Sequence, residues 1–332
     1  MSRIFLNHTY RLFTLRQFPN VSDPNSLENQ PSFVSSFCST DSGTNKHLRK
    51  IKQKLANSII LNKIYTIPTI ESSGSLIPSN SRLFSGGQST NETPDFSDII
   101  ENLDLRVKIN HLIYNGHKFR VGHLRFRFLD YIPVQVFIFV EFSPGFTVIL
   151  TKSLPKMQDV VFDYIAETLN SVIGPLSLSD DFLRSTVDES VQKAVSEEDI
   201  GSGINWHNDL GDIELSFTGI KTKCSALNAI VLNIKFADVP KFIDEEGFVA
   251  GFCSYMQSET SIDFKKLELT RARNEWFLLT SDGRLRFSDR MSYHTQPSRH
   301  DDTRPTIWNI MFSLYTNAGK GTQLQENAET TT

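Results

Sequence analysis

Apolar and polar residues alternate from Leu105 to Ile113, and the pair Asn115-Gly116 follows at once. Alternation with a period of two is typical of a half-buried strand. Asn-Gly is the pair that a tight hairpin prefers, because both residues tolerate a positive φ. The next strand is expected at residues 118–128, and residues 134–142 and 146–150 are rich in Val, Ile and Phe. Four sequential strands joined by short turns predict an antiparallel meander.

The meander is followed by two helical patterns and then by more strands. An apolar face from Pro155 to Val172 predicts a helix that Gly174-Pro175 ends, and Ser179 is placed to cap a second helix reaching about Val195. The later strand-like segments are residues 213–217, 227–236, 267–270, 275–280 and 284–287. Residues 247–256 fit a helix or a strand, and residues 306–315 form a last apolar element. Strands followed by helices, twice over, predict an α+β fold.

Composition divides the chain into five parts. Residues 1–16 alternate as a first strand, and residues 17–104 are mostly flexible polar loops with a short basic helix near 46–64. The stretches 20–45 and 66–95 are the richest in Ser, Asn, Pro and Gly. Residues 105–195 and 204–316 form an N-terminal and a C-terminal α+β half, and residues 317–332 are a disordered tail.

Charge and length restrict the classes of partner. The 332 residues include 34 Lys and Arg against 38 Asp and Glu, so the net charge of −4 gives no overall attraction to nucleic acid or to an acidic membrane. No apolar run approaches the roughly 20 residues of a membrane helix. Three cysteines are too few for a disulfide framework or a thiolate zinc site. Binding to a polyanion would therefore need a local basic patch.

The predicted hairpin supplies such a patch. Between residues 105 and 127 there is no acid, and there are six cations: Arg106, Lys108, Lys118, Arg120, Arg125 and Arg127. A bulge at Gly122 would put the last four on one side and turn Phe126 and Phe128 to the core. Such a stripe would follow a phosphate backbone without reading bases. An ordinary solvated sheet face is the alternative interpretation.

One set of residues is typical of an enzyme. His207, Asp209 and His294, with Arg304 beyond them, match the residue types of an Fe(II)- and 2-oxo acid-dependent oxygenase, in which two His and one carboxylate hold the iron. A chain with eight histidines produces such a set easily, so a solvated loop without metal is the favoured interpretation. The sequence has no phosphate-binding glycine loop and no nucleophile elbow. We expect no catalytic residues, no metal and no cofactor.

Several segments resemble the centromere protein L (CENP-L) family in its fungal form. The clearest is residues 147–191, with Ile-Leu-Thr-Lys-Ser-Leu-Pro at 149–155 and Phe-Asp-Tyr-Ile-Ala-Glu-Thr-Leu at 162–169. Residues 7–12 resemble the family's opening strand, residues 211–215 to 239–242 its later strand pair, and residues 277–285 its closing hairpin. The family often has a Cys-Gly pair before that hairpin, where this chain has Asn274-Glu275.

The resemblance implies a non-enzymatic inner-kinetochore subunit of the constitutive centromere-associated network, located in the nucleus at the centromere. It also implies a curved antiparallel sheet with helices on one face, similar to the TATA-binding-protein type. The implied partners are a CENP-N-type protein and centromeric nucleosome DNA. The same resemblance implies that the strands of residues 267–287 face the partner. The candidate contacts are Leu267, Leu269, Phe277, Leu279, Leu285 and Phe287.

Overall fold

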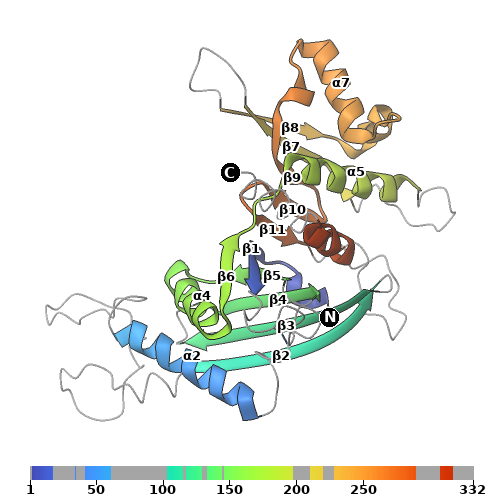
Figure 1. The fold of residues 1–332 in the computed structure, drawn as a ribbon. Coiled ribbons are helices and arrows are strands. Elements are labelled where there is room, and N and C mark those ends of the chain that lie inside the picture. Colours follow the sequence, from blue (N-terminus) through green and yellow to red (C-terminus); the bar gives the residue numbers. More distant parts are fainter. Residues whose placement is uncertain are drawn as a thin grey trace, which may run out of the picture. The chain divides into compact units, whose positions relative to one another are not determined.

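The computed structural model describes residues 2–17, 34, 42–60, 103–114, 117–128, 133–143, 146–196, 210–219, 228–288 and 307–316 (Figure 1). The chain divides into two units. The inserted unit is Thr14–Gly174, and the split unit combines Met1–Phe13 with Pro175–Thr332. In this division the helix after Ser179 lies in the same unit as the C-terminal strands, whereas the division expected from the sequence grouped it with the N-terminal half. The helix after Ser179 belongs with the C-terminal strands because it packs on one of them.

The inserted unit is built on the predicted meander. Its strands are β2 (Leu103–Tyr114), β3 (His117–Phe128), β4 (Gln135–Ser143) and β5 (Phe146–Lys152). Each pairs antiparallel with the next, in the order β2-β3-β4-β5, and the later part of β1 (Thr9–Gln17) follows. In Figure 1 β2 and β3 are long and curved. All residues from Gln135 to Glu141 are buried, so β4 is covered on both faces.

Two helices complete the inserted unit. Helix α4 (Pro155–Leu169) packs on β4, where the rings of Phe162 and Phe137 meet edge to face at 6.1 Å. Helix α2 (Ser42–Ile60) packs on α4 and corresponds to the basic helix expected near 46–64. Helix α4 does not reach Val172, because Asn170 takes the left-handed conformation with φ of 43°. Strand β6 (Ser171–Pro175) then pairs with β1.

The split unit contains the remaining strands. These are β7 (Ile213–Thr218), β8 (Ala229–Ile234), β9 (Glu268–Arg273), β10 (Phe277–Thr280) and β11 (Arg284–Phe287). With the first part of β1 they form the antiparallel order β1-β11-β10-β9-β7-β8. The first and last strands of this unit by sequence, β1 and β11, are thus direct neighbours.

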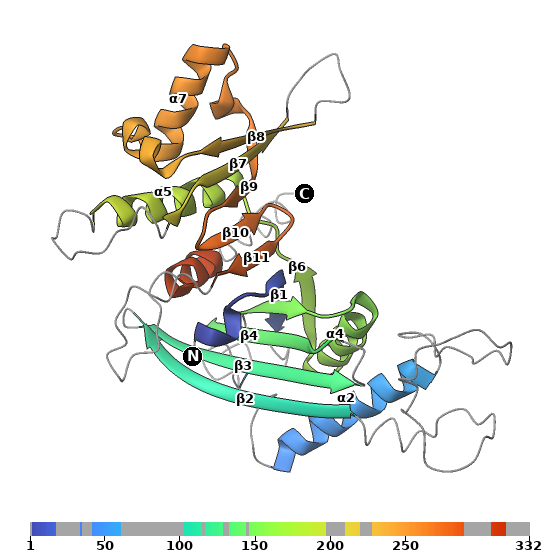
Figure 2. The ribbon, with the colours of Figure 1, turned by 180° about the vertical axis from the view of Figure 1, so that it is seen from behind.

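Helices cover one face of that sheet. They are α5 (Asp180–Ser196), η3 (Phe236–Phe242), α7 (Phe248–Thr260) and η4 (Phe264–Lys266). Ser179 caps α5 as predicted, because its Oγ accepts a hydrogen bond from the N–H of Phe182 at 3.2 Å. Helix α7 settles the conformation of residues 247–256 as helical. Figure 2 shows α5 and α7 beside the β7–β9 strands.

The N-terminus differs from the continuous strand expected over residues 1–16. Residues Ser2–Phe5 form the 3-10 helix η1, and β1 begins only at Thr9. Asn7 lies between them with φ of 58°, a conformation that interrupts an extended chain. The ring of Phe5 packs edge to face on the ring of Trp308, with 5.7 Å between the ring centroids. Trp308 belongs to a helix over residues 307–316.

The predicted α+β class with an antiparallel sheet is confirmed. The similarity to the TATA-binding-protein type stays a prediction.

Candidate functional site

The β2–β3 hairpin holds the six predicted phosphate-binding cations. Its register runs without a break from Leu103 opposite Phe128 to Tyr114 opposite His117, and Gly122 pairs regularly with Ile109 and with Phe139 of β4. The bulge predicted at Gly122 is therefore wrong. In a regular strand, residues of odd and even number point to opposite faces. Lys118 and Arg120 consequently lie on one face, and Arg125 and Arg127 on the other.

Burial along β3 changes face at Gly122. Before it, Phe119 and Val121 are buried, whereas after it Leu124 and Phe126 are buried. The prediction that Phe126 faces the core is confirmed, since its ring stacks on Phe137 at 5.6 Å. The side chain of Phe128 lies outside the described residues. Because each half of β3 buries a different face, both pairs of cations stay accessible without a bulge.

Two acidic residues lie next to these cations in the sheet. Asp104 is the register partner of Arg127, and Glu141 is the register partner of Arg120. Glu141 is buried and its Oε2 accepts a hydrogen bond from the N–H of Val34 at 3.3 Å. On β2, Arg106 stands opposite Arg125. Residues 105–127 contain no acid, but the neighbouring positions of the sheet contain two acidic residues.

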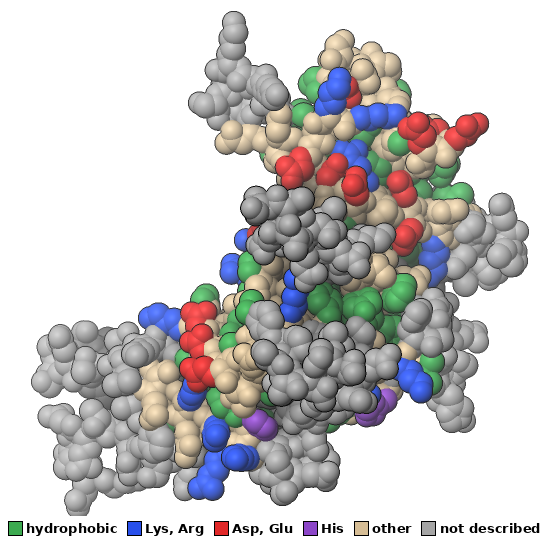
Figure 3. All heavy atoms as spheres, viewed as in Figure 1, with side chains coloured by type: hydrophobic (Ala, Val, Ile, Leu, Met, Phe, Trp, Pro, Cys, Tyr) green, Lys and Arg blue, Asp and Glu red, His purple; other side chains and the backbone are tan. Residues whose placement is uncertain are grey.

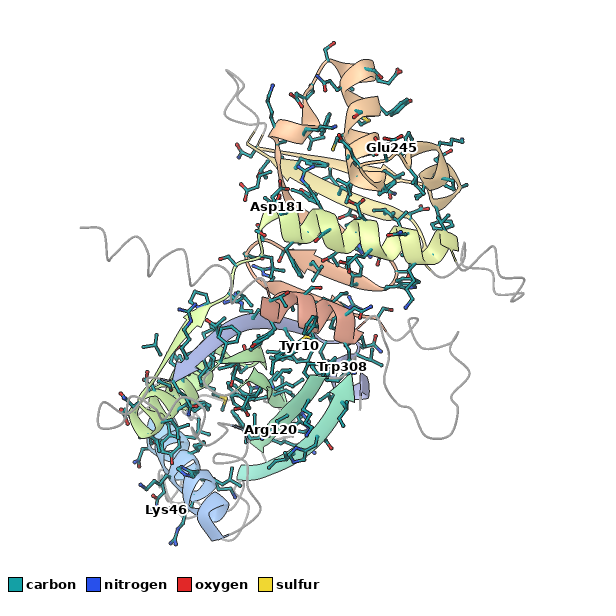
Figure 4. All side chains as sticks on the ribbon, turned by 45° about the vertical axis from the view of Figure 1, so that its right-hand side comes forward. Tyr10, Lys46, Arg120, Asp181, Glu245 and Trp308 are labelled. Carbon is teal, nitrogen blue, oxygen red and sulfur yellow. The ribbon has the colours of Figure 1, made fainter. Side chains whose placement is uncertain are left out.

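Helix α2 adds cations to the inserted unit. Lys46, Arg49 and Lys50 are exposed on it, and Figure 3 shows Lys and Arg side chains gathered over one of its ends. Figure 4 shows Lys46 on this helix and Arg120 on β3. Lys54 instead forms an ion pair with Glu167 of α4. The sequence predicted the basic helix but not that it belongs to the same unit as the hairpin.

Helix α2 is also held to α4 by a contact between two titratable side chains. Nδ1 of His47 lies 2.8 Å from the hydroxyl of Tyr164 in α4. Burial, together with the positive charges of Lys50 and Lys46, lowers the pKa of His47. Burial raises the pKa of Tyr164. Both shifts favour the neutral pair at this helix contact.

The predicted partner-facing side chains are in the core. At most 8% of the surface is exposed for any of the six residues: Leu267, Leu269, Phe277, Leu279, Leu285 and Phe287. Strand β9 lies between β7 and β10, and β10 between β9 and β11, so these strands are inner strands. Their alternation predicted strands correctly, but alternation does not say which strand lies at an edge. These side chains are therefore not accessible at the surface of the single chain.

The edge of the split unit's sheet is β8. Among the described strands it has only β7 as a neighbour. Its side chains are less buried than those of β7, and Val231 is 58% exposed. An edge strand presents unpaired N–H and C=O groups to which another chain can add a strand. The sequence predicted this strand, at residues 227–236, without indicating its position in the sheet.

The predicted oxygenase residues give no described site. His207, Asp209, His294 and Arg304 all lie outside the described residues. Within the described part of the chain, no group of three or more His, Cys, Asp or Glu side chains could hold a metal ion. Over the same residues, no helix is long and apolar enough to cross a membrane.

Comparison with known families finds a match to part of the chain. A family model described as centromere protein L matches residues 144–318, which is slightly more than half of the chain. The match includes β5, α4 and the described C-terminal strands, whereas the basic hairpin and α2 precede it. No curated protein matches the chain.

Proposed function

The chain belongs to the centromere protein L family, and from this we propose that it is a non-enzymatic scaffold subunit of the inner kinetochore. The family match supports a role as a kinetochore subunit in chromosome segregation, at the centromere in the nucleus. The proposed subunit binds a protein partner at the β8 edge and DNA at the basic hairpin. We also propose that the curved sheet with α4 on one face is of the TATA-binding-protein type.

The protein partner we propose is a CENP-N-type protein that adds a strand to β8. The support is the position of β8 at the edge of the described sheet, together with the exposed Val231. Backbone hydrogen bonds to the added strand would give affinity, and side chains facing Val231 would give specificity. The proposed interface lies on the C-terminal unit, at the β8 edge, and does not use the six buried residues, which belong to β9, β10, β11 and the position just before β9.

Affinity purification of the tagged protein from dividing cells tests the scaffold, with Val231→Lys as the variant. We expect the parent protein to recover a CENP-N-type protein and other centromere subunits, and Val231→Lys to lose them. Val172→Lys is the matched control, because Val172 is an exposed valine, at 54%, in strand β6 of the other unit. A parent protein that recovers no centromere subunit contradicts the scaffold. Equal recovery by both variants contradicts the β8 interface alone.

The DNA-binding part of the proposal uses the hairpin face that carries Arg125 and Arg127. This face is the candidate with more cations, because Arg106 and Lys108 of β2 stand opposite Arg125 and His123 of β3. Lys118 and Arg120 have Ile113 and His111 opposite them, and Glu141 beside Arg120. Contacts to phosphate oxygens would give binding that is independent of base sequence and weakened by salt.

Charge reversal of the two pairs separates the faces. We expect Arg125→Glu with Arg127→Glu to reduce the affinity of the partner-bound protein for duplex DNA, and to lower the salt slope of log K by about 2. The pair Lys118→Glu with Arg120→Glu is the matched control and is expected to change the slope by less. If neither pair changes the affinity or the slope, the hairpin is not a DNA surface.

A further inference from the structure

One face of the split unit's sheet carries a group of arginines that the proposed function does not use. They come from three strands: Arg11 of β1, Arg271 and Arg273 of β9, and Arg284 and Arg286 of β11. The residues between them, such as Ala272 and Leu285, are buried on the opposite face. The arginines therefore point away from the layer that α5 and α7 form.

The strand register places these arginines on one face. Arg284 is opposite Arg11 in β1 and opposite Thr280 in β10, and Thr280 is also opposite Arg271 in β9. In the next row, Leu278 of β10 is opposite both Arg286 and Arg273. Directly opposite residues of an antiparallel pair share a face.

Arg284 is balanced more fully by acidic groups than Arg271, Arg273 and Arg286 are. Nε of Arg284 forms an ion pair with Oδ2 of Asp282 at 2.8 Å. One carboxylate, that of Glu214, lies 3.2 Å from Arg271 Nη2 and 3.8 Å from Arg273 Nη1, so it is shared by two guanidinium groups. Arg286 has no ion pair with any residue that the structure describes. The face therefore keeps an excess of positive charge at Arg271, Arg273 and Arg286.

These three arginines surround a hollow of about 300 Å³. The side chains that line it include Arg271, Arg273, Asn274, Glu275, Leu278 and Arg286. The Nε of Arg271 is buried and has no hydrogen-bond acceptor among the described residues. A buried donor without an acceptor is unfavourable unless a ligand supplies one. Glu275 lines the hollow and Glu214 is shared by Arg271 and Arg273, so three guanidinium groups face two carboxylates. The remaining positive charge suits the hollow to an anion.

We propose that this hollow binds the phosphate group of a phosphorylated serine or threonine in a protein partner. Guanidinium groups match phosphate oxygens in pairs of parallel hydrogen bonds, and a phosphate dianion would supply the acceptor that Arg271 Nε lacks. The half-exposed Leu278 offers an apolar contact to the residue beside the phosphate. Strands β9 and β10 have both edges paired, so recognition here is by side chains and not by an added strand.

A nucleic acid backbone fits this face less well. Its repeated phosphates require a row of available cations, whereas Arg284 is occupied by Asp282 and three of the other four arginines converge on one hollow. The hollow is lined by no exposed aromatic side chain on which a base could stack.

An array of degenerate short peptides with a fixed central phosphoserine, probed with the labelled full-length chain, tests the proposal. The same peptides with serine and a short DNA duplex are measured beside it, and the best phosphopeptide is then titrated by fluorescence anisotropy. We expect phosphoserine to bind at least about tenfold more tightly than serine, and Arg273→Gln with Arg286→Gln to remove about tenfold or more of that affinity. Arg284→Gln is the matched control and is expected to bind as the parent does.

The outcomes are distinct. No preference for phosphoserine across the array, or equal binding by the double variant and the parent, overturns the proposal. Duplex binding that depends on Arg273 and Arg286, without phosphopeptide binding, also overturns it and assigns the face to nucleic acid. Both substituted arginines are exposed, so a thermal melt that matches the parent's is expected for the variants. The result is independent of whether centromere subunits are recovered with the chain.

Discussion

Gly283 is required at its position for two separate reasons. Its φ of +78° lies in the left-handed region, and an added Cβ would lie 2.2 Å from the carbonyl oxygen of Leu176. Gly219 has a similar φ of +86°, but no described atom lies within 4 Å of where its Cβ would be. The pair of glycines therefore separates backbone strain from a steric clash.

We expect Gly219→Ala to lower the free energy of unfolding by about 1 kcal/mol, from the left-handed backbone alone. Gly283→Ala should lower it by more than about 2 kcal/mol, because the chain must also move away from Leu176. Urea unfolding of the two variants measures both values. Equal losses would show that the clash is relieved without cost.

The side chain of His47 makes the stability of helix α2 depend on pH. The folded state holds the pKa of His47 below its ordinary value of 6.5, mainly through burial. As pH falls below about 6.5, the unfolded chain takes up the proton first, so the stability that depends on neutral His47 is present above this pH and is lost below it. We expect the amide protection factors of α2, which correct for the base-catalysed intrinsic exchange rate, to be lower at pH 5 than at pH 7.5. In His47→Gln, which does not titrate, this component should be absent; an unchanged pH dependence would exclude His47 as its cause.

At the scale of elements, one carboxylate joins α5 to β9. Oδ1 of Asp180 accepts hydrogen bonds from the N–H of Leu269 and from Nε of Arg184, both at 2.8 Å. Nη2 of Arg184 in turn donates to the carbonyl oxygen of Leu267 at 2.8 Å. The first turn of the helix is thereby fixed to the beginning of an inner strand.

We expect Asp180→Ala to lower the free energy of unfolding by about 2 kcal/mol, because it leaves the Leu269 N–H and the Arg184 guanidinium without their acceptor. Asp181→Ala is the matched control: this neighbour, labelled in Figure 4, is exposed in the same first turn. Its loss should cost only about 0.5 kcal/mol, through the helix dipole. Thermal unfolding of both variants decides, and similar losses would contradict the link to β9.

The strands show how far sequence patterns reach. Alternation and turn residues identified β2 to β5 and β7 to β11, because both report local geometry. The same patterns did not place β8 at the edge or Leu279 in the core, because strand order depends on pairings between distant segments. At Gly122 the missing side chain indicated an irregularity, but the structure changes the buried face there while the register stays regular. The arginines of β9 and β11 alternate with buried residues, and that pattern was a usable signal for the face they form.

At the scale of the whole molecule, β1 completes a sheet whose other strands come from the far end of the chain. Tyr10 is fully buried, pairs with Leu285 in the register, and donates a hydrogen bond from its hydroxyl to the carbonyl oxygen of Ile4 at 2.6 Å. Burial raises the pKa of this phenol well above its ordinary range. The N-terminus is therefore part of the C-terminal core (Figure 4).

Tyr10→Ala should destabilise the split unit by about 4 kcal/mol, as expected for the loss of a buried aromatic ring. Tyr10→Phe keeps the ring and should cost about 1 kcal/mol, from the hydroxyl alone. Hydrogen exchange at the β11 amides is the measurement, because these amides lie far from residue 10 in sequence. Protection of β11 that survives Tyr10→Ala would contradict the coupling.

The pairing of β1 with β11 also sets the order of events during synthesis. Thr9 leaves the ribosome early, but its register partner Arg286 is translated on the order of half a minute later, at about 10 residues per second. Until then the first residues of β1 lack their β11 partner, although β5 and β6 have already been translated. Co-translational folding can complete the inserted meander first, whereas the split unit cannot close until β11 has been translated, so a chaperone that shields β1 would act in that interval.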